Sequence, residues 1–114
     1  MISRSLTKDV SDSESTIFLV IGANAYGMSI FLQNSGQNDV TYKFQEATEN
    51  SDPSFADITG ESGILAAGSV VLHKIDSSLP YIRLRAWAAG GSDLMIGVSQ
   101  WVLNTSNVLP ILNI

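Results

Sequence analysis

The chain has 114 residues and a formal net charge of −5, and only 15% of its residues are charged, against roughly 25% in an average soluble domain. Six basic against eleven acidic residues, with no basic run, argue against nucleic acid or an anionic membrane surface as a partner. The absence of cysteine excludes disulfides, thiolate metal sites and cysteine nucleophiles.

The predicted elements are almost all strands. Residues 1–15 are polar and rich in serine, and we expect them to form a flexible N-terminal arm. Strands are predicted at 17–21, 28–33 and 40–47, the last with strict apolar and polar alternation. Residues 48–63 are predicted to be a long connection in which Phe55 and Ile58 reach the core. Strands follow at 69–75, 81–88 and 94–103.

This order of elements predicts an all-β fold. Turn signals recur roughly every 8–12 residues, which is typical of a sandwich or barrel. We expect a single antiparallel β-sandwich of six to eight strands, Ig-like or jelly-roll-like, over residues 16–103. The arm 1–15 would precede it, and an apolar C-terminal tail, 104–114, would follow.

The predicted strand 81–88 has two unlike faces. Its apolar residues point inward, so Arg83, Arg85 and Trp87 should lie together on the opposite face. Arg and Trp are favoured at interface hot spots, which allows a contact patch. A solvated sheet face with cross-strand partners such as Glu46 or Glu49 is the other interpretation. The low charge of the whole chain favours some contact with other subunits.

The chain shows no residue set that predicts catalysis. His73 is the only histidine and falls in the middle of a predicted strand. A catalytic triad would need it beside a nucleophilic serine and an orienting carboxylate, and none of the serines stands in a nucleophile-elbow context. We therefore expect a protein that is not an enzyme and uses no cofactor.

Metal binding is predicted to be absent as well. The acidic residues that come nearest to a ligand set are Asp9, Asp12 and Glu14, and Asp52, Asp57 and Glu61. The first three lack the glycine and the bidentate glutamate of a calcium loop. The other three share one long loop, where carboxylates that cap turns in water are the favoured interpretation.

Sugar binding stays open as an alternative. Acidic β-sandwiches with exposed aromatic residues include many carbohydrate-binding modules, and Trp87, Trp101 and Tyr26 are the candidates for stacking on a sugar ring. Each of them could equally pack in the core or at a subunit contact.

One stretch of sequence resembles a known class of proteins. Residues 31–47 read FLQNSGQNDVTYKFQEA, followed by an Ala-Ala-Gly turn at 66–68 and by YIRLRA at 81–86. Over roughly residues 28–103, this succession is similar to small β-sandwich virion proteins of tailed bacteriophages. The resemblance implies a capsid decoration (cement) protein, commonly a trimer on the shell that reaches its neighbours through extended termini.

These observations lead to one functional expectation. We expect a non-enzymatic virion protein, made in the host cytoplasm, that binds the major capsid protein on the outer capsid surface as a homotrimer. A tail or baseplate module and a carbohydrate-binding sandwich are the alternatives. The predicted subunit or capsid contacts are Arg83, Arg85, Trp87, Leu109, Ile111, Leu112 and Ile114.

Overall fold

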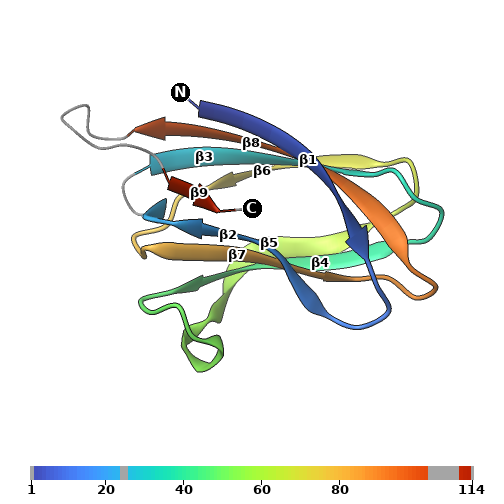
Figure 1. Cartoon of the computed structure of the whole chain (residues 1–114), viewed down its shortest axis with the longest axis horizontal. Coiled ribbons are helices and arrows are strands. Elements are labelled where there is room, and N and C mark those ends of the chain that lie inside the picture. The colour runs from blue at the N-terminus through green and yellow to red at the C-terminus, as the bar shows by residue number, and fades with distance from the viewer. Residues whose placement is uncertain (1, 24–25, 103–110, 114) are drawn as a thin grey trace.

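The computed structural model describes the backbone of residues 2–23, 26–102 and 111–113, and the side chains of residues 5–23 and 27–100. These parts of the chain are all-β (Figure 1). The strands are β1 (Ile2–Val10), β2 (Ser15–Ile21), β3 (Tyr26–Asn34), β4 (Val40–Ala47), β5 (Ala56–Leu65), β6 (Val70–Ile75), β7 (Tyr81–Trp87), β8 (Ser92–Val102) and β9 (Ile111–Asn113). A 3-10 turn, η2 (Asp52–Ser54), precedes β5. Within the described ranges, no helix has the length and apolar character of a membrane span.

The strands form two antiparallel sheets that face each other. One sheet has the order β1-β8-β3-β6, and the other has β5-β4-β7-β2, with the short β9 added beside β2. The antiparallel pairs enclose one another in chain order. The innermost pair is β4–β5, followed by β3–β6, β2–β7 and β1–β8, as in one long hairpin that has been rolled up. This is the connectivity of a double-sheet jelly roll. The predicted β-sandwich is therefore confirmed, in its jelly-roll form.

The core lies between the two sheets and follows the period-two pattern of the strands. Alternate residues of β4 and β7 are fully buried, among them Phe44, Ile82 and Leu84. Ile30 and Leu32 of β3 meet them from the other sheet as members of the same buried cluster. Since successive side chains of a strand point to opposite sides, the residues between these face outward.

The predicted N-terminal arm is wrong over most of its length. Residues 2–10 form β1, which pairs with β8 from Ile2↔Gln100 to Val10↔Ser92. The inward side of β1 includes Leu6, Lys8 and Val10, so a lysine interrupts the apolar alternation that would have marked a strand. Inward charges are a known feature of edge strands, where they discourage pairing with other chains.

The long connection predicted at 48–63 is also wrong in part, because it contains most of β5. Residues 58–61 of β5 stand opposite the single residue Phe44, since Lys43 pairs with Ser62 and Gln45 pairs with Asp57. Gly60 has a φ of 84° within this bulge. The bulge shifts the alternation so that Glu61 faces inward and Ile64 outward. Ile58 packs against the core, as predicted.

The predicted C-terminal tail is described only at Ile111–Asn113. These residues form β9 and pair with β2 of the same chain, from Leu19↔Asn113 to Ile21↔Ile111. The remaining tail residues, Leu109 and Ile114 among them, lie outside the described residues, as do the side chains of Trp101 and Tyr26.

Candidate functional site: two unlike sheet faces

The outer face of the β1-β8-β3-β6 sheet is uncharged across its middle. We call it the uncharged face. Val70 and Leu72 of β6 are 56% and 58% exposed, and Met95 of β8 is 37% exposed. The register aligns Leu72 with Phe31 and Phe31 with Gly97, and it aligns Val70 with Gln33 and Gln33 with Met95. Two rows of uncharged side chains therefore cross the sheet.

Charged side chains are found only at the two ends of this face among the described residues. Lys74 marks one end, opposite Ser29. Asp9 and Asp93 stand directly opposite each other at the other end. A hydrogen bond with Asp9, together with burial and the negative charge of Asp9, raises the pKa of the Asp93 carboxyl. Like charges placed directly opposite on two strands destabilise a sheet.

The outer face of the β5-β4-β7-β2 sheet is different, because ion pairs cross it. We call it the charged face. Arg85 donates to Glu14 through Nε at 3.0 Å and to Thr16 through Nη1 at 2.8 Å, and its Nη2 lies 2.8 Å from Glu14 Oε2 in an ion pair. Lys43 Nζ lies 3.7 Å from Glu14 and 3.6 Å from Asp57. The network thus joins the β1–β2 turn to four strands, β2, β4, β5 and β7.

Arg83 continues this network at a more buried position. It is only 8% exposed. Its Nε donates to Gln45 at 2.8 Å, and its Nη1 donates to Asp52 at 2.7 Å. The guanidinium also stacks 3.9 Å above the centre of the Phe55 ring. Gln45 in turn donates to Asp57 at 2.8 Å.

Arg83, Arg85 and Trp87 do share the outer face, as the alternation of β7 predicts. The partners predicted for the two arginines are wrong. They are Gln45, Asp52, Glu14 and Thr16 instead of Glu46 or Glu49. Sequence alone could not find them because Asp52 and Glu14 come from turns. The role of these residues in contacts between subunits stays a prediction.

A hollow of about 290 Å³ opens on the charged face beside Trp87. Thr41 pairs with Trp87 on one side and with Ile64 on the other, so a small side chain lies between two large ones. Ile64 is 70% exposed, and Trp87 is half-buried. Lys43, Asp57 and Ser62 line the hollow further along the strands. We call this hollow the Trp87 trough.

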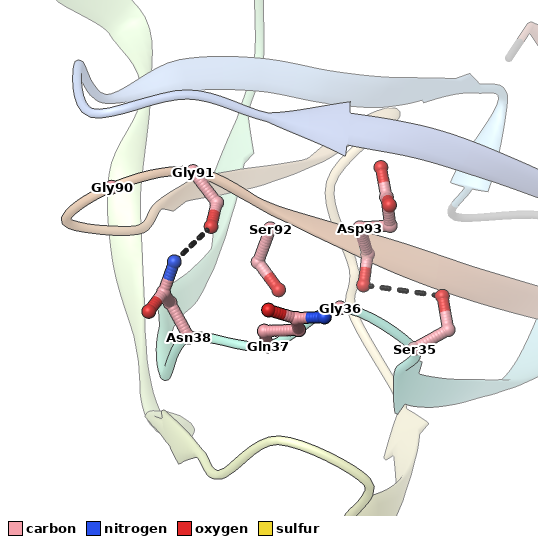
Figure 2. Close-up of a pocket in the computed structure, with 8 residues that line it drawn as sticks. All are labelled: Ser35, Gly36, Gln37, Asn38, Gly90, Gly91, Ser92 and Asp93. Carbon is pink, nitrogen blue, oxygen red and sulfur yellow. Dashed lines mark hydrogen bonds between the residues drawn. The ribbon is translucent and has the colours of Figure 1, made fainter.

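A second hollow, of about 390 Å³, lies at the end of the sandwich where the β3–β4 and β7–β8 turns meet (Figure 2). Asn38 Nδ2 donates to the Gly91 carbonyl at 2.7 Å, and Ser35 Oγ donates to the Asp93 carbonyl at 3.4 Å. A Cβ at Gly36 would lie 2.6 Å from the Asp93 nitrogen, so only glycine fits there. The lining is polar, and these bonds join one turn to the other.

Asn34 holds this end of the molecule together. It is fully buried at the end of β3. Its Nδ2 donates to the carbonyls of Asn38 at 2.7 Å and Leu65 at 2.9 Å. Its Oδ1 accepts from Gly36 N at 3.1 Å and from Ser92 Oγ at 2.7 Å. The bond to Leu65 connects the two sheets.

His73 has two hydrogen-bond partners that the sequence did not indicate. Its Nε2 lies 2.6 Å from the Tyr42 hydroxyl, and its Nδ1 contacts Glu61 Oε2. Burial, with the charge of Glu61 as a second cause, raises the pKa of Tyr42. The hydroxyl therefore keeps its proton at neutral pH, and His73 joins Tyr42 to Glu61 through its two ring nitrogens. This cluster links β6 to β4 and β5 across the edge of the sandwich.

The remaining candidate carboxylates are dispersed. Asp52, Asp57 and Glu61 bind Arg83, Gln45 and His73 respectively. Asp12 accepts a hydrogen bond from the Gly90 nitrogen at 2.8 Å. In the part of the chain that the structure describes, no three acidic or histidine side chains gather as metal ligands.

Comparison with known proteins yields no sequence family. No protein-family model matches the chain, and no curated protein matches it. Solved structures do match in shape. PirA has a TM-score of 0.59 at 11% identity, covering 85% of this chain and 93% of its own. The SPBc2 prophage-derived protein YomS has a TM-score of 0.53 at 14% identity, covering 89% and 96%.

A pilus protein is also similar. A chain of the Bacillus endospore appendages, described as disulfide-linked pili, has a TM-score of 0.57 at 13% identity, covering 90% of this chain and 88% of its own. At such identities the likeness concerns the fold alone. The present 114 residues contain no cysteine, so they cannot form a disulfide-linked assembly.

Proposed function

We propose that this chain is a non-enzymatic structural protein of a phage particle, a capsid decoration protein that binds the outer shell as a trimer. The observation that carries the proposal is the uncharged face. Val70, Leu72 and Met95 expose apolar surface there without any charged residue between them. Exposed apolar patches of this kind mark interaction sites on soluble proteins.

The size of the uncharged face indicates how it would bind. Four strands at about 4.8 Å spacing and a β6 strand of about 20 Å give a flat area of roughly 400 Å². A standard stable interface buries about 800 Å² on each partner. One subunit would therefore bind weakly, and several linked copies would bind firmly through their combined contacts. A trimer supplies such copies.

Two further observations support the proposal. The resemblance of residues 28–103 to small virion sandwiches names the same class of protein. The prophage-derived protein YomS shares the fold, although at 14% identity this adds only that such a fold occurs in a phage-derived protein.

A binding experiment with undecorated capsid shells tests the proposal. Light scattering of the free protein gives its oligomeric state, and co-sedimentation with shells gives its affinity. The double variant Val70→Lys, Leu72→Lys should lose at least about tenfold in affinity, because binding would then bury two charges. Ile64→Lys, at a position on the charged face that is also more than half exposed, is the matched control and should bind normally.

Full affinity of the double variant would overturn the uncharged face as the contact. A wild-type protein that stays monomeric and ignores the shells would overturn decoration itself. In that case, antibody labelling of intact phage particles would show whether the protein lies in the tail or baseplate or is absent from the particle.

A further inference from the structure

The Trp87 trough has the shape of a small-ligand site. Thr41 forms its floor, and Trp87 and Ile64 rise on either side because the register places all three in one row across β7, β4 and β5. Neighbouring strands are about 4.8 Å apart, so the two walls stand roughly 10 Å apart. A single six-membered ring fits between them. The volume of about 290 Å³ lies at the small end of ligand pockets.

The Trp87 ring is available to a ligand. Among the described side chains, the ring contacts join Phe18, Phe44, Tyr42 and His73 inside the sandwich and Arg83 with Phe55 outside it, and none of them involves Trp87. An aromatic ring at a surface offers a flat apolar face together with an N–H donor.

The far end of the trough is polar and held in place. Asp57 accepts from Gln45 at 2.8 Å and lies 3.6 Å from Lys43 Nζ. The Gln45 hydrogen bond, reinforced by the Lys43 charge, lowers the pKa of Asp57, so the carboxylate is ionised at neutral pH. Ser62 pairs with Lys43 in the register and is exposed. An ammonium and a hydroxyl thus stand one row from the apolar row, and the carboxylate of Asp57 lies beyond them, 3.6 Å from the ammonium.

We propose that the Trp87 trough binds one hexose unit of a glycan, with one face of the pyranose ring on Trp87 and its hydroxyls toward Lys43, Asp57 and Ser62. A pyranose combines an apolar C–H face with a rim of donors and acceptors, which matches an apolar row beside a polar one. A purely apolar side chain of a protein partner would leave the charged groups without new hydrogen bonds.

This site is independent of the proposed shell contact, because it lies on the other sheet. A decoration protein with both features would bind the shell by its uncharged face and present the charged face outward, toward glycans. Failure of either proposal leaves the other standing.

Titration followed by ¹⁵N–¹H correlation spectra tests the trough. The probes are the methyl glycosides of glucose, galactose, mannose and N-acetylglucosamine at millimolar concentration. At least one should give saturable shifts of the Trp87 indole N–H and of the Thr41 and Ser62 amides. Trp87→Ala should weaken binding about tenfold or more, since it removes the aromatic face on which the pyranose ring would lie.

Thr41→Leu is the second variant, because it fills the floor of the trough and leaves Trp87 in place. It too should abolish the shifts, and the dispersion of the spectrum reports that it is folded. Leu72→Ser on the uncharged face is the control and should bind as the wild type does.

Three outcomes would overturn the proposal. One is that none of the four glycosides causes saturable shifts at the trough. Another is that the shifts persist in folded Thr41→Leu protein. The third is that leucine amide or N-acetyltryptophan amide binds the trough and the sugars do not, which would make it a pocket for a protein side chain.

Discussion

The two outer faces of this sandwich come from the same alternation of side chains along the strands. They differ in whether the side chains that point outward have partners within the chain. On the charged face, nearly every large polar side chain has a partner within the chain, from Thr16 through Arg85 and Lys43 to Asp52. On the uncharged face, Val70 and Leu72 expose apolar surface that no described element covers. The charged face thus satisfies its own polar groups and leaves only the Trp87 trough open, whereas the uncharged face offers apolar surface that a partner would cover.

The largest effect should come from the residue on which both faces depend. Asn34→Ala removes four hydrogen bonds at a buried position and leaves the Leu65 carbonyl without its donor. Each buried polar group that loses its partner costs about 1–3 kcal/mol. We expect a loss of roughly 3–4 kcal/mol in the free energy of unfolding, measured by urea denaturation. A loss below 1 kcal/mol would mean that the turns of the two sheets hold together without it.

The next largest effect tests whether the polar network of the charged face stabilises the fold. Arg83→Met removes the bonds to Gln45 and Asp52 and the stacking on Phe55. We expect the free energy of unfolding to fall by about 2 kcal/mol, since hydrogen bonds to charged groups contribute about 1.5–3 kcal/mol. Lys74→Met, an exposed cation of the other sheet, is the control and should change stability by less than about 0.5 kcal/mol. Equal effects of the two substitutions would contradict the comparison.

A small effect is expected on the uncharged face in the isolated protein. Leu72→Lys should change the free energy of unfolding by less than about 0.5 kcal/mol, because Leu72 is 58% exposed and its loss leaves no cavity. Thermal denaturation of wild type and variant at low protein concentration measures this. A large loss would show that Leu72 supports the fold and is not held there for a partner.

The smallest effect concerns the acidic end of the uncharged face and depends on pH. The pKa of Asp93 is raised in the folded state, so this group contributes stability below its ordinary pKa and loses it as the pH rises through the folded value. Asp9→Asn removes the opposing charge. The melting temperature of the variant should therefore exceed that of the wild type at neutral pH, and the two should converge in acid. A gain that is constant with pH would have another cause.

The central strands and the edge strand β6 could be predicted from sequence, whereas β1 and most of β5, which are also edge strands, could not. β4 and β7 are buried on one side over their whole length, so apolar residues occupy every second position, as at Tyr42 and Phe44 and at Ile82 and Leu84. β1 and β5 each lie at the edge of a sheet. Lys8 interrupts the pattern of β1, and the bulge at Gly60 shifts the phase of β5. Edge strands bury less, so burial constrains their sequences less.

The candidate sites depend on register, which a single sequence does not give. The alternation of β7 placed Trp87 outward, but only the pairing of Thr41 with both Trp87 and Ile64 makes a trough. The sequence predicts a strand at 69–75, and only the structure shows that Val70 and Leu72 lie on a side that no described element covers. His73 gained partners from β4 and β5 because two sheets close over it, which no local pattern records.

The rolled connectivity has a consequence for the time course of folding. β4 and β5 are neighbours in the chain, whereas β1 must pair with β8 across some eighty intervening residues. Closing a long loop costs more chain entropy than closing a short one, so we expect the β4–β5 hairpin to form first and the outer pairs to add in turn. β1, although synthesised first, would be among the last strands to find its place. In pulse-labelled hydrogen exchange, the amides of β4 should accordingly become protected before those of β1.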